Sequence, residues 1–192
     1  MKVLSILGSP RPKGNSATLA GHLTGRLKEH GASVETHLLN KMEYKGCQSC
    51  YACKKKSDRC VVRDDISPVL DAMHEADAIV MASPNYYGSI SGQMKLFLDR
   101  TFSLLTPEFA TGGNPSRLSP GKHLVFIFTQ GADETLFTDV VPKFKEFKHY
   151  YQFEDVHTLH GCRLMDGGDA SGRPELLAEA EEIARGLVKA LN

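Results

Sequence analysis

The chain of 192 residues is 41% hydrophobic and 24% charged, which is enough apolar material for a core and excludes a disordered or fibrous protein. Its 23 basic and 23 acidic side chains give a formal net charge of zero, so we expect no nucleic-acid partner. No stretch approaches the roughly 18 uninterrupted apolar residues of a membrane-spanning helix, and we expect no membrane partner.

The first ten residues, MKVLSILGSP, form a short apolar run that reaches Gly8 and Pro10 before it attains the length of a signal peptide. We therefore expect no export signal and a cytoplasmic location. Thiols stay reduced in that compartment, so clustered cysteines more often bind metal or do chemistry than form structural disulfides.

Short apolar runs alternate along the chain with longer amphipathic segments, the pattern of strand-helix-strand units in a parallel sheet. Five strands are predicted, at residues 3–7, 34–38, 78–82, 123–128 and 156–159. Apolar residues recur at helical spacing in three segments: Leu19, Leu23 and Leu27; Met94, Leu98 and Phe102; and Leu177, Ala180, Ala184, Leu187 and Leu191. Length and pattern together predict an α/β fold and a single domain over residues 1–192.

The first predicted strand leads into GSPRPKGNS, residues 8–16, and then into a helix. Asn15 and Ser16 are residue types suited to capping that helix, and the free amide groups at a helix start attract an anion. The loop differs from the nucleotide P-loop because Lys13 precedes Gly14, and it also lacks the glycine spacing of dinucleotide sites. The sequence therefore predicts a cup for a single phosphate monoester, with an ordinary strand-to-helix turn as the alternative.

Two further strand ends carry small, polar and aromatic residues. The third strand continues as SPNYYGSISGQMKLFLDR at residues 83–100, and the fourth as TQGADE at residues 129–134. We expect Pro84 to end its strand, Tyr86 and Tyr87 to offer flat aromatic surfaces, and Gly88 to permit a close approach. Ligands of such sheets bind beyond the carboxyl ends of the strands, so the three loops together describe a site for flavin mononucleotide (FMN).

The phosphate loop, the segment 83–100 and the order of the strands resemble the flavodoxin-like family of NADPH-dependent FMN reductases over nearly the whole chain. The resemblance implies a doubly wound, five-stranded parallel sheet in three layers, α/β/α. It implies that the FMN phosphate is held by Ser9, Arg11, Asn15, Ser16 and Ala17. It implies that the isoalloxazine ring is lined by Pro84, Asn85, Tyr86, Tyr87, Gly88 and Ser89, with Thr129, Gln130 and Gly131 at its far edge. The sequence shows no acid-base pair or nucleophile triad, so no catalytic residue is assigned.

A cysteine-rich loop, GCQSCYACKKKSDRC, occupies residues 46–60 inside an irregular stretch of the predicted fold. It contains four of the five cysteines, and cysteines three apart on a tight loop reach one iron-sulfur cluster, as in the compact runs of ferredoxins. The run looks like the motif of the iron-sulfur flavoproteins, a branch of the same family that holds a [4Fe-4S] cluster beside the FMN. This resemblance implies that the cluster ligands are Cys47, Cys50, Cys53 and Cys60.

Three alternatives to the cluster stay open. Structural zinc usually takes two pairs of cysteines separated by a dozen or more residues, a wider spacing than this loop has. A thioredoxin-like dithiol needs only Cys50 and Cys53 and leaves the other two cysteines unexplained. Members of the wider family also carry these cysteines and the following Cys-Val-x-x-Asp-Asp, here residues 60–65, without the motif guaranteeing a cluster.

Charged residues at two places near these motifs are interpreted without chemistry. The run from Lys54 to Lys56 is interpreted as a solvated face. Asp99 and Arg100 end an amphipathic helix, and we expect a local ion pair or a subunit contact there.

Two functions fit these features. The first is an FMN-containing oxidoreductase that takes electrons from NAD(P)H and reduces flavin, quinone or another small acceptor. The alternative is an iron-sulfur flavoprotein that carries electrons between protein partners, such as a ferredoxin-like protein, through FMN and a [4Fe-4S] cluster. The resemblance also implies a homodimer or homotetramer.

Overall fold

The computed structural model describes residues 1–191, which are built around one sheet. Its strands are β1 (Lys2–Leu7), β2 (Ser33–Leu38), β3 (Ala78–Tyr86), β4 (Ser89–Ile90), β5 (His123–Thr129) and β6 (Asp155–Gly161). Five of them are parallel in the order β2-β1-β3-β5-β6, and the short β4 pairs antiparallel with the end of β3. This is the doubly wound strand order of flavodoxin-like folds, so the predicted fold class and its five parallel strands are confirmed. The single domain stays a prediction.

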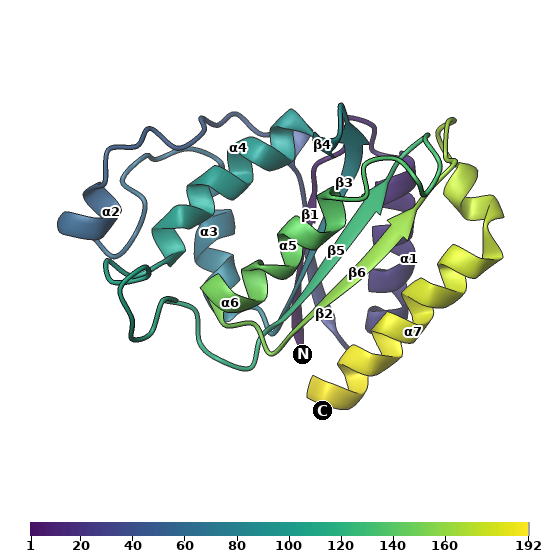
Figure 1. Cartoon of the computed structure of the whole chain (residues 1–192). Helices are drawn as coiled ribbons and strands as arrows, with labels where there is room; N and C mark the ends of the chain where they lie inside the picture. Colours follow the sequence, from purple (N-terminus) through teal and green to yellow (C-terminus); the bar gives the residue numbers. More distant parts are fainter. Residues whose placement is uncertain (192) are drawn as a thin grey trace.

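Helices cover both faces of the sheet, which gives the three predicted layers (Figure 1). The helices are α1 (Asn15–Glu29), α2 (Ala52–Lys55), α3 (Ile66–Glu75), α4 (Gly92–Arg100), α5 (Val140–Lys145), α6 (Phe147–Tyr151) and α7 (Pro174–Leu191), with the 3-10 turns η1 (Leu39–Lys41), η2 (Thr101–Leu104) and η3 (Asp169–Gly172). Helices α1 and α7 lie on one face, and α3 to α6 lie on the other, while α2 stands apart on the cysteine loop. None of the helices within residues 1–191 is long and apolar enough to cross a membrane.

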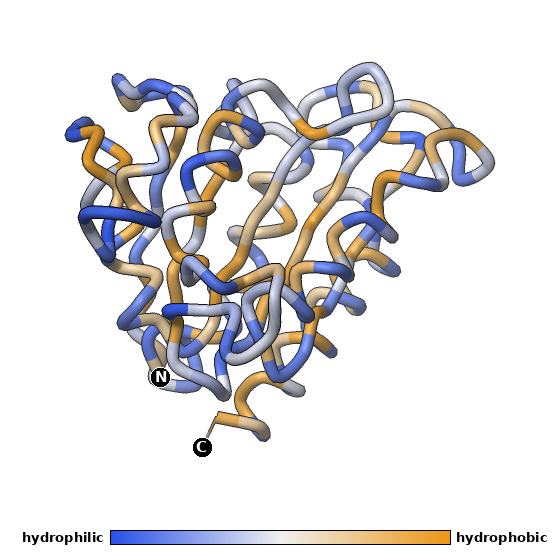
Figure 2. Tube along the Cα trace, turned by 60° about the vertical axis from the view of Figure 1, so that its left-hand side comes forward, coloured by the Kyte–Doolittle hydropathy of each residue, from blue (hydrophilic) through white to orange (hydrophobic). Residues whose placement is uncertain are grey.

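The central strands are apolar on both faces because each face is covered by helices. All seven residues of β5 are buried, and successive side chains enter opposite cores. Leu124 and Phe126 pack with α3 to α6, whereas Val125 and Ile127 pack with α1 and α7. Figure 2 shows the result as hydrophobic strands at the centre and helices that alternate between hydrophobic and hydrophilic turns.

The prediction that Pro84 ends the third strand is wrong. Strand β3 continues to Tyr86, and Pro84 pairs with Thr129 of β5. Strand β1 pairs with β3 only as far as Ala82, so beyond that residue one side of β3 has no parallel neighbour. Proline is tolerated at such an edge, where its missing N–H costs no ladder hydrogen bond. The longer strand carries the side chains of its last residues past the edge of the sheet.

Helix α4 is fixed at its start by the buried Ser91, which serves as its N-cap. The Ser91 hydroxyl accepts the N–H of Met94 at 3.2 Å and donates to the carbonyl oxygen of Gly8 at 2.7 Å. The Ser91 N–H donates to Ser83 Oγ at 2.9 Å. Helix α4 therefore begins beside the end of β1, and its nine residues carry the chain about 14 Å away from it to Arg100.

Candidate functional site

A cavity of about 170 Å³ lies where β1, β3 and β5 end. The predicted residues that line it are Ser9, Arg11, Asn15, Ser16, Pro84, Asn85, Tyr86, Thr129, Gln130 and Gly131. Leu164 and Met165, which the sequence did not predict, complete the lining. The predicted residues outside the lining are Ala17, Tyr87, Gly88 and Ser89. The parallel topology thus brings the three predicted loops together, because the carboxyl ends of their strands meet at one edge.

The loop after β1 is closed by its own polar groups. The N–H of Arg11 donates to Ser9 Oγ at 3.1 Å, and the N–H of Gly14 donates to the carbonyl oxygen of Arg11 at 3.0 Å. A Cβ atom on Gly14 would lie 2.9 Å from Ser9 Oγ, so the tight loop requires glycine there. Gly14 is also the N-cap of α1 and supplies no side-chain acceptor, so the first N–H groups of the helix stay free for an anion.

Asn15 begins α1, but neither it nor Ser16 caps the helix, so the predicted capping role is wrong. The buried Asn15 side chain instead reaches the loop before η3. Its Nδ2 donates to the carbonyl oxygens of Leu164 at 3.3 Å and Asp166 at 2.8 Å, and its Oδ1 accepts the N–H groups of Gly168 at 3.2 Å and Ala170 at 3.0 Å. These four bonds use the full capacity of the side-chain amide. A contact between Asn15 and an anion would therefore come from the backbone N–H of Asn15.

Asn85 lines the cavity with an acceptor that lacks a partner. Its Nδ2 donates to Gln130 Oε1 at 2.8 Å, and Gln130 is held in turn by the carbonyl oxygens of Asp133 at 2.7 Å and Leu136 at 3.2 Å. Asn85 Oδ1 is buried and has no hydrogen-bond partner within residues 1–191. Leaving such an acceptor unpaired costs about 1–3 kcal/mol, a cost that a ligand N–H or O–H reaching it from the cavity would remove.

A tight turn joins β3 to β4 at the rim of the cavity. Tyr87 and Gly88 both have positive φ, 52° and 71°, as the favoured two-residue hairpin turns require. A Cβ atom on Gly88 would lie 2.9 Å from the ring of Phe137, so the turn packs closely on the loop after β5. The side chains of Tyr86 and Tyr87 are exposed and offer aromatic surface to a planar molecule at the rim.

A second cavity, of about 440 Å³, lies at the other end of α4 and is lined by all four cysteines of the loop. Cys53 is buried and Cys60 is half-buried, whereas Cys47 and Cys50 are exposed. Within residues 1–191, no three His, Cys, Asp or Glu side chains are grouped so that they hold one metal ion. The four sulfurs therefore share a cavity without converging on a single point. The two cavities have no lining residue in common.

Two cationic side chains fix the segment around Cys53. The Lys54 ammonium donates to the carbonyl oxygens of Phe102 and Leu105, both at 2.5 Å, and lies 4.1 Å from the centroid of the Phe102 ring. Burial lowers the pKa of Lys54. Arg117 donates to the carbonyl oxygen of Cys53 at 2.9 Å. The interpretation of the lysine run as a solvated face is therefore wrong for Lys54.

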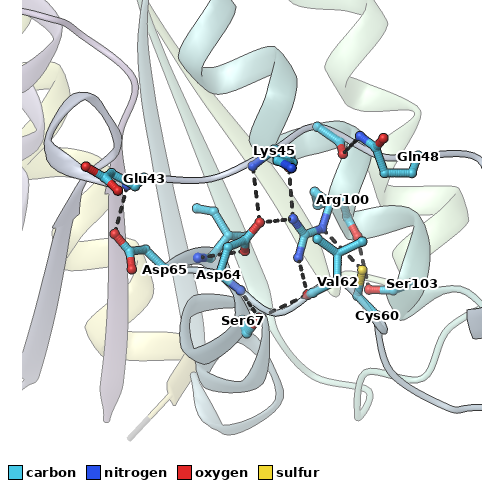
Figure 3. A network of polar contacts seen from close by, with 12 residues as sticks. Glu43, Lys45, Gln48, Cys60, Val62, Asp64, Asp65, Ser67, Arg100 and Ser103 are labelled. Atoms are coloured by element: carbon cyan, nitrogen blue, oxygen red, sulfur yellow. Dashed lines mark hydrogen bonds and ion pairs between the residues drawn. The ribbon is translucent and has the colours of Figure 1, made fainter.

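Arg100 lies at the centre of a polar network beside the same cavity (Figure 3). Its side chain is fully buried, and its Nε donates to Cys60 Sγ at 3.2 Å. Its Nη1 donates to Asp64 Oδ2 at 2.6 Å and to the carbonyl oxygen of Lys45 at 2.8 Å, and its Nη2 donates to the carbonyl oxygen of Val62 at 2.9 Å. Burial opposes the ionisation of Asp64, but the hydrogen bonds from Arg100 and Lys45 outweigh it and hold the pKa of Asp64 below its usual value.

The sequence interpretation of the end of α4 is right for one residue only. Asp99 forms the expected local ion pair, with Lys95 at 2.5 Å. Arg100 instead pairs with the distant Asp64 inside the protein. An arginine at the end of an amphipathic helix carries no sequence signal of such burial, because its partners come from a loop whose path the pattern does not predict.

Comparisons with known proteins point in the same direction as this geometry. A model of the family described as NADPH-dependent FMN reductase matches residues 1–136. An iron-sulfur flavoprotein of Methanocaldococcus jannaschii is 39% identical over 101 residues, which cover 53% of this chain and 52% of that protein. An iron-sulfur flavoprotein of Methanosarcina thermophila is 34% identical over 110 residues, which cover 57% of each chain. The chain spans about half the length of the curated relatives it matches.

Solved structures share the fold over almost the whole chain. An FMN-dependent NADH-azoreductase of Bacillus anthracis, solved in complex with FMN, has a TM-score of 0.75 at 18% identity and covers 98% of this chain and 100% of its own. An NAD(P)H:quinone oxidoreductase of Methanothermobacter marburgensis has a TM-score of 0.76 at 18% identity, with 97% and 96% covered. At this identity the likeness establishes the fold.

We predict that Asn15→Ala lowers the free energy of unfolding by roughly 3 kcal/mol, because four hydrogen bonds of a buried amide are lost and their backbone partners stay buried. Urea unfolding followed by circular dichroism measures the change. Asn40→Ala is the matched control, because the two hydrogen bonds of the Asn40 side chain, to Pro10 and Gln93, are exposed and their partners can bond water instead, so it should cost less than about 1 kcal/mol. Equal effects of the two substitutions would contradict the role given to Asn15.

Proposed function

Because a model of the NADPH-dependent FMN reductases matches residues 1–136, the chain belongs to that family, and we propose that it is an FMN-containing oxidoreductase that uses NAD(P)H to reduce a small acceptor, such as free flavin or a quinone. The buried, unpartnered acceptor of Asn85, a residue that lines the cavity at the strand ends, carries this proposal. FMN, when bound, supplies the chemistry of accepting a hydride from a nicotinamide and passing electrons on.

The donor set of the cavity fits each part of FMN. The free N–H groups of the first turn of α1, with the hydroxyls of Ser9 and Ser16, suit the phosphate, and Arg11 adds a positive charge at the rim. The Asn85 acceptor suits an N–H or O–H of the flavin or its sugar chain. Thr129, Gln130 and Gly131 line the same cavity, and we assign them to the far edge of the ring, the role that the resemblance implied. The four predicted residues outside the lining keep their proposed roles at the rim: Ala17, Tyr87, Gly88 and Ser89.

The chain contributes binding and orientation rather than proton transfer. The cavity lining contains no carboxylate, histidine, lysine or cysteine, so no side chain there is placed to act as an acid or base near neutral pH. Gln130 holds the Asn85 amide in one orientation, and the hairpin turn leaves Tyr86 and Tyr87 exposed where a planar acceptor can stack. This arrangement explains why the sequence shows no catalytic pair. It also favours a flat, conjugated acceptor such as a quinone or a flavin.

A second candidate function is favoured by one observation, the presence of all four loop cysteines on one cavity. In this candidate Cys47, Cys50, Cys53 and Cys60 bind a [4Fe-4S] cluster, and the protein carries electrons to or from a ferredoxin-like partner. A cluster, when bound, supplies single-electron transfer, and thiolates are the ligands that iron-sulfur clusters take. Cys53 and Cys60 are held by the surrounding protein, while Cys47 and Cys50 are exposed. A cytoplasmic location and a homodimer or homotetramer stay predictions.

We predict that Asn85→Leu raises the dissociation constant for FMN about tenfold, since the lost hydrogen bond is worth roughly 1.4 kcal/mol. Quenching of FMN fluorescence measures binding, and oxidation of NADPH or NADH with a quinone acceptor measures turnover. Turnover of the variant should fall at limiting FMN and recover at saturating FMN.

The matched control is Asn114→Leu, the same substitution at an exposed position away from the cavity, which should bind FMN as the wild type does. Wild-type affinity in Asn85→Leu would show that FMN does not occupy this cavity. A wild type that binds FMN but oxidises neither nicotinamide would overturn the proposed activity while leaving the cofactor site intact.

The second candidate predicts that anaerobically purified protein contains about four irons and four acid-labile sulfides per FMN. Cys53→Ala should lose them, whereas Cys162→Ala should keep them, because Cys162 lies outside the cysteine cavity. Metal analysis that finds zinc, or no metal, in the wild type would refute the iron-sulfur candidate and leave the FMN reductase proposal standing.

A further inference from the structure

One side chain of α4 bridges the two ends of the cysteine loop, which we call its stem. Lys45 precedes the first cysteine and Val62 follows the last, and the guanidinium of Arg100 donates to the carbonyl oxygens of both, at 2.8 and 2.9 Å. The two ends of the loop are therefore joined through α4 as well as through direct hydrogen bonds, in which the N–H of Lys45 donates to Asp64 Oδ2 at 3.1 Å and the N–H of Glu43 donates to Asp65 Oδ2 at 2.8 Å. The planar fork of arginine suits this task, because it presents several donors in fixed directions.

Asp64 sets the direction in which that fork points. Its Oδ2 accepts from Arg100 Nη1 at 2.6 Å and from the N–H of Lys45 at 3.1 Å, and its Oδ1 accepts the N–H of Ile66 at 3.2 Å. The same carboxylate thus neutralises the buried guanidinium and ties the loop to the start of α3. Figure 3 shows Arg100 between Asp64, Lys45, Val62 and Cys60, with each contact directed at the guanidinium.

Arg100 also donates a hydrogen bond to a cysteine sulfur. Its Nε lies 3.2 Å from Cys60 Sγ, on the wall of the cysteine cavity. In the part of the chain that the structure describes, this is the sole hydrogen bond to a sulfur of the loop cysteines. Hydrogen bonds to ligating sulfurs orient the ligand and are one of the factors that set the potential of an iron-sulfur cluster.

We propose that Arg100 is a positioning residue of the cysteine site: it closes the stem of the loop and presents the Cys60 sulfur to the cavity. Cys60, which is held by Arg100, and Cys53, which is held through Arg117, then form the fixed half of the site. The exposed Cys47 and Cys50 form the other half. The closure of the stem stands on the contacts alone, while the effect on a cluster rests on the iron-sulfur candidate. There, the N–H bond withdraws electron density from sulfur and makes the cluster easier to reduce.

The first test is hydrogen exchange in the metal-free full-length protein. In Arg100→Lys a single ammonium cannot satisfy the four acceptors, so the N–H of Lys45 should exchange at least about tenfold faster while the amides of β1, β3 and β5 stay protected. Arg117→Lys is the matched control: it loosens the contact to Cys53 but touches neither end of the stem, and the Lys45 N–H should keep its protection. Unchanged exchange of this amide in Arg100→Lys would overturn the proposal.

If Arg100→Lys does not fold, Asp64→Asn takes its place, because it keeps the guanidinium and removes the charge that directs it. It should also speed exchange at Lys45, and unchanged exchange would again overturn the closure of the stem.

The second test uses iron-loaded protein and a redox titration followed by electron paramagnetic resonance. Arg100→Lys should have a more negative cluster potential than the wild type, and Arg26→Lys, the same substitution on α1 away from the cysteine cavity, should match the wild type. Equal potentials in all three proteins would overturn the role of the bond to Cys60. A wild type without iron would refute the iron-sulfur candidate instead, and the exchange comparison would still decide whether Arg100 closes the stem.

Discussion

Helix α4 is held at each end by a buried polar side chain, and both candidate sites depend on where these two contacts place it. At its start the Ser91 hydroxyl is bonded to the carbonyl oxygen of Gly8, the residue that begins the phosphate loop. At its end Arg100 is bonded to Asp64, Cys60 and the stem of the cysteine loop. Removing a partner from either contact leaves a buried group unpaired at a cost of about 1–3 kcal/mol or more, so the helix has one well-defined position.

The two cavities at the ends of α4 are built by different means. The cavity at the strand ends uses backbone N–H groups, amides and hydroxyls, with Arg11 as its one cationic side chain. The cysteine cavity is surrounded by the cations Lys54, Arg100 and Arg117, each of which binds backbone carbonyl oxygens of the loops around it. Positive charge near four thiols suits an anionic cluster, whereas a polar lining with a single cation, Arg11, suits a flavin that carries one phosphate. The difference in lining supports two separate roles in one chain.

The sequence predicted the parts of the structure that depend on local pattern and on topology. Apolar runs located all five parallel strands, and the rule that ligands bind beyond strand ends selected most of the residues that line the first cavity. The spacing of the cysteines identified the loop whose four cysteines line the second cavity. Strand β3 was predicted too short because the rule for proline assumes neighbours on both sides of a strand.

The residues that the sequence misjudged act through distant contacts. The side-chain partners of Asn15 lie 149 to 155 positions away, and those of Arg100 lie 36 to 55 positions away. No periodicity relates residues so far apart, so an apparent helix cap became a tie to a remote loop, and an apparent surface arginine became the centre of a buried network. Leu164 and Met165 reach the first cavity in the same way, through a loop that follows β6.

We propose that this chain binds FMN in the cavity at the strand ends and accepts electrons there from a nicotinamide. Anaerobic stopped-flow mixing of the FMN-loaded protein with NADPH, and separately with NADH, tests it most directly. Rapid loss of the flavin absorbance with at least one nicotinamide is the predicted result. A flavin that keeps its absorbance with both nicotinamides and loses it only with reduced ferredoxin would contradict the reductase and favour the electron carrier.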